Sequence, residues 1–206
     1  MSFLRNKYWV LRHGRSIPNE RGLIVSSMEN GTLEEYKLAT EGINQAHLAG
    51  ELFRKELEKY VIPLENARIC YSPFSRTSHT AKVVASSLDI PFESPQCKYA
   101  EIWALDEKDP FMKAEEGGES VSDVVSRLTN ALLTIESQFE GCAILVVSHG
   151  DPLQILQTML HAARELGRPD NDDDDLASRI QAILVPHILS QHRKFSLLTG
   201  ELRAVV

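Results

Sequence analysis

The sequence predicts an α/β fold: a three-layer sandwich in which helices cover both faces of a mostly parallel central sheet. The main observation is that short apolar runs alternate along the chain with segments whose apolar residues recur at helical spacing. Continuous apolar runs are typical of strands buried on both faces, as in parallel sheets. No internal repeat or linker divides the 206 residues, so we expect a single domain over residues 1–206.

The first predicted element is a buried strand at residues 8–11, an apolar run that ends at Arg12. Residues 16–39 are polar and contain Gly and Pro, so an ordered loop is expected there. A helix is expected from Thr40, acting as its cap, to about Tyr60, because apolar residues recur on one face of that segment.

The middle of the chain is expected to continue this alternation. Residues 67–71 predict a second strand, and residues 75–88 predict a helix that Asp89-Ile90-Pro91 stops. After a glycine pair at residues 117–118, Ser120 is expected to cap a long amphipathic helix, since an acidic residue follows three positions later.

The last third contains the clearest buried strand of the sequence, at residues 142–147. Asp151-Pro152 is expected to open the next helix, with Asp as the N-cap and Pro as the first helical residue. Pro186 is expected to interrupt any helix within residues 176–192, and residues 195–206 are expected to form a final pair of strands.

Composition limits the classes of partner. The formal net charge is -7, which argues against nucleic acid or an acidic membrane surface, because basic stripes bind both. A small anionic ligand remains compatible, because a pocket can gather arginines inside an acidic protein. The three cysteines include no C-x-x-C pair, and no signal peptide or long apolar run is present, so a reducing, cytoplasmic location is expected.

Three predicted strands end in residues suited to binding an anion. These are Arg12-His13-Gly14, the stretch from Ser72 to Arg76, and Ser148-His149-Gly150. In open α/β sheets, ligands bind beyond the carboxyl ends of the strands. If the strands are parallel neighbours, two histidines and two arginines converge there, which is a combination suited to a phosphate group.

Each of these residue types has a role in phosphoryl transfer. Arg12 and Arg76 are candidates to hold the charged oxygens, because a guanidinium binds two phosphate oxygens at once. His149 is expected to add a donor, and Gly14 to let the backbone approach the ligand closely. His13 can act as the nucleophile through one ring nitrogen, while a hydrogen bond at the other nitrogen sets its tautomer.

Five motifs follow one another between Lys7 and Leu156. They are Arg12-His13-Gly14 with Ser16 and Asn19; Leu38, Thr40, Gly42 and Gln45; Ser72-Pro73 with Arg76-Thr77 and Thr80; Gly117-Gly118-Glu119-Ser120; and Ser148-His149-Gly150. In this order they resemble the signature of the histidine phosphatases, also called the phosphoglycerate mutase-like superfamily.

The resemblance implies a phosphoglycerate mutase-like fold and a phosphohistidine on His13. It implies that Arg12, Arg76 and His149 form the phosphate pocket, that Asn19 lines it, and that no metal or other cofactor is needed. An alternative role for Asn19, read from its residue type, is to cap a turn. In such enzymes a carboxylic acid protonates the leaving oxygen and then activates water.

The carboxylic acid is the point where the pattern breaks. The family's acid segment resembles L-R-E-x-x-F-G, and counting forward from Arg76 places Glu101 in its position. Counting backward from residues 117–118 instead leaves the acid segment absent, as an internal deletion would. Arg15 is a second departure, since Glu or Gln is usual there. Both alignments stay open. Glu101 is the candidate acid in the alignment that counts forward from Arg76.

We therefore predict a phosphomonoester phosphatase whose substrate is a small anionic phosphate ester. Two alternatives share the same pocket. One is a phosphotransferase of the phosphoglycerate mutase type. The other is a weakly active or non-catalytic phosphate-binding protein that has lost its general-acid segment.

Overall fold

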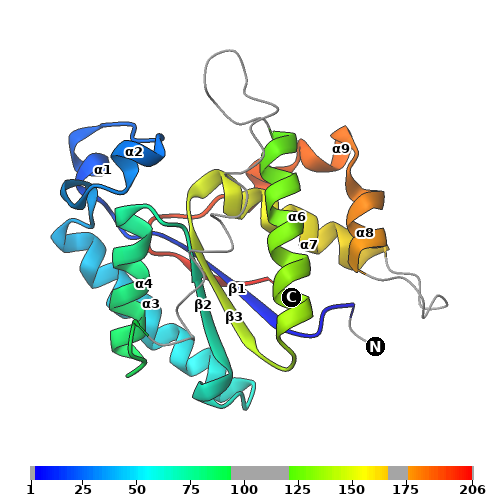
Figure 1. The fold of residues 1–206 in the computed structure, drawn as a ribbon, viewed down its shortest axis with the longest axis horizontal. Helices are drawn as coiled ribbons and strands as arrows, with labels where there is room; N and C mark the ends of the chain where they lie inside the picture. Colours follow the sequence, from blue (N-terminus) through cyan, green and yellow to red (C-terminus); the bar gives the residue numbers. More distant parts are fainter. Residues whose placement is uncertain (1–2, 94–120, 167–175, 206) are drawn as a thin grey trace.

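A four-stranded sheet forms the centre of the described part of the chain (Figure 1). The computed structural model describes residues 3–93, 121–166 and 176–205. The strand order is β2-β3-β1-β4. Strands β1, β2 and β3 are parallel, and β4 is antiparallel to β1 at one edge. The bounds are β1 Lys7–Arg12, β2 Ala67–Tyr71, β3 Ala143–Ser148 and β4 Leu202–Ala204.

The three parallel strands are buried because helices cover both faces of the sheet. Successive side chains of a strand point to opposite faces, and β1 shows this directly. Tyr8 and Val10 pack in one apolar core, whereas Trp9 and Leu11 pack in another. All six residues of β3 are buried. This arrangement confirms the predicted α/β class with a mostly parallel sheet.

The long helices divide between the two faces (Figure 1). Helices α3 (Thr40–Lys59) and α4 (Ser75–Ser87) cover one face, and their apolar residues join the core that contains Trp9. On the other face lie α6 (Val121–Gln138), α7 (Gly150–Leu166) and α8 (Leu176–Ile183). None of the described helices combines the length and apolarity needed to cross a bilayer.

The segment predicted as a loop, residues 16–39, contains three short helices instead. They are α1 (Ile17–Arg21), α2 (Met28–Gly31) and the 3₁₀ helix η1 (Glu34–Tyr36). Serine side chains cap the first two, because Ser16 accepts from the backbone N–H of Asn19 and Ser27 from that of Asn30. Local capping therefore outweighs the polar, Gly-containing composition on which the loop prediction rested.

Two predicted helix caps are wrong. Helix α3 begins at Thr40 itself, and Ala39 is its N-cap without a side-chain hydrogen bond. Helix α7 begins at Gly150, so Asp151 lies in its first turn and does not cap it. The predicted cap Ser120 lies outside the described residues.

The C-terminal region also differs from the prediction. Instead of a pair of strands in residues 195–206, one strand, β4, pairs with β1. Gly200 has φ +73° and donates its N–H to Arg12 O (3.1 Å), which ties the preceding turn to the end of β1. The break at Pro186 is confirmed, because α8 ends at Ile183 and α9 (Pro186–Leu189) starts at the proline. The remaining short helices of the described residues are η2 (Leu64–Asn66) and η5 (His192–Phe195).

Candidate active site

The sheet register brings His13 and His149 together. Strands β1 and β3 run parallel with Arg12 opposite Ser148, so the residue after each strand is a histidine on the same edge. The two ring centroids are 5.4 Å apart. His13 is only 4% exposed, and its backbone N–H donates to Ser148 O (3.0 Å). The carboxyl edge of the sheet thus holds two imidazoles in contact.

Arg76 reaches this pair from the second residue of α4. Its Nε donates to His149 Nδ1 (3.3 Å), and its Nη2 donates to the backbone oxygen of Val25 (3.1 Å). The guanidinium lies over the ring of Phe74, 4.8 Å from the ring centroid, and that ring also packs against His149. Burial lowers the pKa of Arg76 to about 10, which leaves it a cation at neutral pH.

Arg12 is the last residue of β1. Its Nη1 donates to Leu197 O (2.7 Å), and its guanidinium lies close to Gly150, the first residue of α7. The Arg12 Nε is buried and has no hydrogen-bond partner among the described residues. A buried donor without a partner is uncommon in folded proteins, so this N–H is a candidate donor to an anion.

The tautomer of His13 follows from its contact with Gly14. The His13 Nδ1 lies 2.8 Å from Gly14 O, and since a carbonyl only accepts, Nδ1 must carry the proton. The lone pair is therefore on Nε2. Burial, followed by the charges of Arg76 and Arg12, lowers the pKa of His13 to about 4, although its bond to Gly14 opposes this shift. His13 is thus neutral at neutral pH, with a free nucleophilic nitrogen.

His149 has the opposite tautomer. The Arg76 Nε–H can only donate, so His149 Nδ1 is unprotonated and the proton is on Nε2. That proton is directed at Ser72 Oγ, 3.1 Å away. The pKa of His149 is held well below its ordinary value by burial and then by the charge of Arg76.

Gly14 has a packing role that its contacts show directly. A Cβ at this position would lie 2.3 Å from Gly42 O, so the glycine allows close contact with the start of α3. Its N–H donates to Thr80 Oγ1 (3.1 Å), and that hydroxyl in turn donates to Arg76 O (2.8 Å). Gly14 therefore packs the loop that follows β1 against α3 and α4, and its N–H is occupied.

Asn19 takes part in a capping box at the start of α1. Its Oδ1 accepts from the backbone N–H of Ser16 (3.1 Å), and its side chain is exposed. This is the capping role that its residue type allowed. Arg15 is also exposed, 3.9 Å from a carboxylate oxygen of Glu20. Glu101 lies outside the described residues, as does the glycine pair at 117–118.

Two hydroxyl residues at the site were not among the predicted site residues. Ser72 accepts the proton of His149, and Thr80 joins the loop after His13 to α4. Both lie within the motif that contains Arg76. Their position in that motif was visible, but their contacts depend on how β2 and α4 pack against β1.

A comparison with protein families matches residues 8–97 and 91–178 to the family described as the histidine phosphatase superfamily (branch 1). The chain belongs to the histidine phosphatase superfamily. The two matched segments overlap at residues 91–97, shortly before Glu101. A search of curated protein sequences found no significant match.

Solved structures of histidine phosphatase relatives share the fold. The α-ribazole phosphatase of Shigella flexneri is 19% identical with a TM-score of 0.55, and the match covers 96% of this chain and 89% of that one. The phosphoserine phosphatase of Entamoeba histolytica is 18% identical with a TM-score of 0.53, covering 96% and 88%. A mycobacterial glucosyl-3-phosphoglycerate phosphatase is 18% identical with a TM-score of 0.53, covering 95% and 88%. These similarities establish the fold.

Proposed function

We propose that the protein is a phosphomonoester phosphatase that forms a phosphohistidine on His13. The observation that carries the proposal is the state of His13. It is neutral and buried, its Nδ1–H is held by Gly14 O, and its bare Nε2 lies in a site shared with His149 and two arginines. The named activities of the three structural relatives are all phosphatase activities, which supports the same reaction class.

In the proposed first step, the phosphoryl group binds between Arg12 and Arg76. The unpartnered Nε–H of Arg12 is one donor to its oxygens, and Arg76 supplies others by turning from Val25 O. Negative charge spreads over the equatorial oxygens in the transition state, so fixed positive donors stabilise it. The charges of these two arginines are our reason for proposing a metal-independent reaction.

In the second step, His13 Nε2 attacks phosphorus and the bond to the leaving oxygen breaks. The departing oxygen takes a proton from a general acid, for which Glu101 is the candidate. Water then attacks the phosphohistidine, which releases phosphate and restores the neutral imidazole. His149 contributes its Nε2–H, with a phosphoryl oxygen replacing Ser72 Oγ as the acceptor.

Phosphate labelling tests the proposed nucleophile. We expect a ³²P-labelled aryl phosphate to label the protein with a bond that acid breaks and alkali does not, as for phosphohistidine. The His13→Ala variant is expected to remain unlabelled, and an Arg15→Ala variant, altered at an exposed neighbour, is expected to label normally. Undiminished labelling of the His13→Ala variant would show that another residue is the nucleophile.

A further inference from the structure

A groove beside α4 lies apart from the site at His13. Residues along an α-helix are separated by about 100° around its axis, so Ser75, His79 and Lys82 share one side of α4, whereas Arg76 and Thr80 share another. The second side faces the active site, as the contacts of Arg76 and Thr80 show. The first side lines a groove of about 620 Å³.

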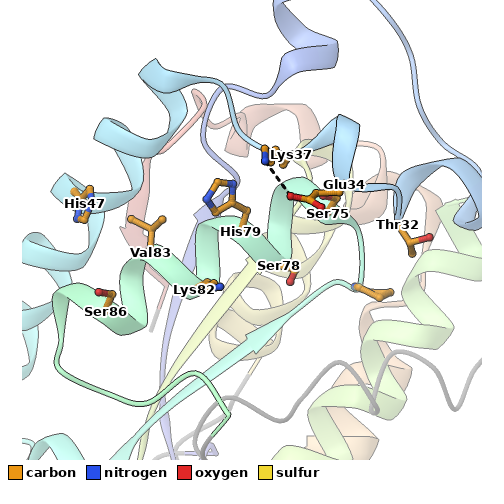
Figure 2. A pocket seen from close by; sticks show the side chains of 11 residues that line it. Thr32, Glu34, Lys37, His47, Ser75, Ser78, His79, Lys82, Val83 and Ser86 are labelled. Atoms are coloured by element: carbon orange, nitrogen blue, oxygen red, sulfur yellow. Dashed lines mark hydrogen bonds and ion pairs between the residues drawn. The ribbon is translucent and has the colours of Figure 1, made fainter.

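The groove is open to one side and is bordered by three parts of the chain (Figure 2). Helix α4 forms its floor, Glu34 and Lys37 border it from the segment around η1, and His47 borders it from α3. Its volume falls within the range of about 300–1,000 Å³ that is usual for small-molecule sites. Only Pro73 and Val83 among the lining residues are apolar. A polar ligand therefore suits the groove better than an apolar one.

Positive groups outnumber negative groups in the lining, although the whole chain has a net charge of -7. Glu34 is the one carboxylate among the lining residues, and its Oε1 is 3.0 Å from Lys37 Nζ. Lys82 is exposed and has no hydrogen-bond or ion-pair partner among the described residues. The one carboxylate of the lining is thus paired with Lys37, and the two lysines together leave one positive charge in excess.

His79 adds an unsatisfied nitrogen next to these lysines. Its Nδ1 is buried and has no hydrogen-bond partner in the part of the chain that the structure describes. Burial, followed by the charges of Lys37 and Lys82, lowers the pKa of His79, whereas Glu34 opposes the shift. Buried polar nitrogens normally have a partner, and an acceptor with negative charge would pair with His79 Nδ1 when that nitrogen carries a proton, and with Lys82.

We propose that this groove is a second binding site, which recognises the phosphate dianion of a small phosphorylated molecule or of free phosphate. A dianion matches Lys82, which has no ion-pair partner among the described residues, together with the Nδ1 of His79, which has no hydrogen-bond partner among them. Ser75 and Ser78 add hydroxyl donors from the same helix. A carboxylate ligand has one negative charge and two oxygens, so it leaves more of these donors unpaired. The site does not depend on catalysis at His13.

The first experiment is a titration with inorganic phosphate, observed through the imidazole NMR signals of His79. We expect a saturable shift of these signals and a rise in the pKa of His79, because a neighbouring dianion favours the protonated ring. The titratable and charged groups around the ring are Lys37, Lys82, Glu34 and His47. Acetate is expected to have a much smaller effect. No shift of the His79 signals, or equal shifts with acetate, would overturn the proposal.

Matched variants locate the binding. Lys82→Met is expected to weaken the response of His79 to phosphate by about tenfold or more, as for the loss of one charged hydrogen bond. Lys55→Met removes an exposed lysine of α3 outside the groove lining and is expected to have no effect. If Lys82→Met does not fold, Lys37→Met is the second variant. An unchanged response in the groove variants would overturn the proposal.

A non-hydrolysable alkyl phosphonate distinguishes the two sources of the dianion. Binding tighter than that of inorganic phosphate indicates that the groove also holds an organic part, and equal binding indicates free phosphate. The His13→Ala variant tests whether the groove proposal is independent of the proposed reaction at His13. We expect it to abolish phosphoenzyme labelling and to leave the His79 response unchanged, so the two proposals fail independently.

Discussion

At the scale of single residues, the two histidines are distinguished by what their neighbours can donate or accept. A backbone carbonyl holds the proton of His13 on Nδ1, and an arginine N–H keeps His149 Nδ1 bare. The rings, 5.4 Å apart, therefore carry opposite tautomers. One presents a lone pair suited to attack, and the other retains a proton suited to donation.

Ser72 is expected to be a positioning residue for His149. Ser72→Ala removes the acceptor of the Nε2–H, so the ring loses one of its two hydrogen bonds. We expect a fall in kcat/KM of about tenfold, in line with the worth of one hydrogen bond in a buried network. Ser72→Thr keeps a hydroxyl and is expected to restore most of the activity. Imidazole ¹⁵N shifts of His149 report the tautomer directly, and an unchanged tautomer with unchanged kinetics would contradict the assignment.

The buried neutral state of His13 predicts a pH dependence of stability. Its folded pKa is about 4, below the ordinary value of 6.5, so the unfolded chain binds more protons between these values. Stability is therefore fully present above pH 6.5 and is lost as the pH falls towards 4, by about 3 kcal/mol for this group. Urea unfolding of the wild type and of His13→Gln at pH 7 and pH 4.5 measures this. The loss is expected to be smaller in the variant, and equal losses would refute the prediction.

At the scale of elements, α4 contributes one side to the candidate active site and another to the groove, and α3 has a strained end. The two sides of α4 follow from helical geometry, since Arg76 and Thr80 project to the active site while His79 and Lys82 project to the groove. Helix α3 ends with Ile62 N–H donating to Leu57 O (2.9 Å), the pattern of a Schellman motif. Val61 occupies its left-handed position with φ 54° and is 86% exposed.

Val61→Gly is expected to stabilise the protein by about 1 kcal/mol. The reason is that a left-handed backbone costs an L-residue roughly 1–2 kcal/mol, a cost that glycine avoids. Part of this gain is lost because glycine makes the unfolded chain more flexible. Val61→Ala keeps a Cβ and serves as the control, for which we expect a smaller effect. Chemical denaturation gives the free energy of unfolding. A Val61→Gly variant less stable than the wild type would disprove the interpretation.

At the scale of the whole molecule, the carboxyl edge of the sheet collects residues that are far apart in the chain. Arg12 ends β1 and His13 follows it, Ser72 and Arg76 follow β2, and His149 follows β3. Their meeting requires the parallel pairing of β1 and β2 with β3. The proposed reaction also needs a general acid, for which Glu101 is the candidate. The first segment matched to the family ends at residue 97, and the second begins at residue 91, shortly before Glu101.

Leaving-group dependence tests Glu101. If it is the general acid, Glu101→Gln lowers kcat/KM for an alkyl phosphate by about 10²–10⁴-fold. An aryl phosphate is affected far less, because its leaving oxygen needs little protonation. Glu93→Gln, at an exposed carboxylate, is the control and is expected to leave both rates unchanged. An alkyl rate that is already negligible in the wild type and unaffected by Glu101→Gln would show that the acid segment is absent.

The amino-acid sequence alone was enough to predict the class of fold and to nominate the main residues of the candidate site. Strand runs such as 8–11 and 142–147 are apolar throughout, so their burial in a parallel sheet was readable, and polar motifs at their ends had to share one edge. The short helices within 16–39 and the start of α7 at Gly150 were not readable in this way. The helices within residues 16–39 form because serine side chains cap them, although the polar composition of the segment favours a loop.

Contacts between segments that are far apart in the sequence could be identified from the three-dimensional structure and not from the sequence. The tautomer of His149 is set by Arg76 and Ser72, more than seventy residues away in the chain. The packing role of Gly14 is set by the oxygen of Gly42, and the pairing of β4 by β1. Sequence periodicity reports which face of an element is buried, whereas hydrogen-bond partners follow from three-dimensional packing, which periodicity does not encode.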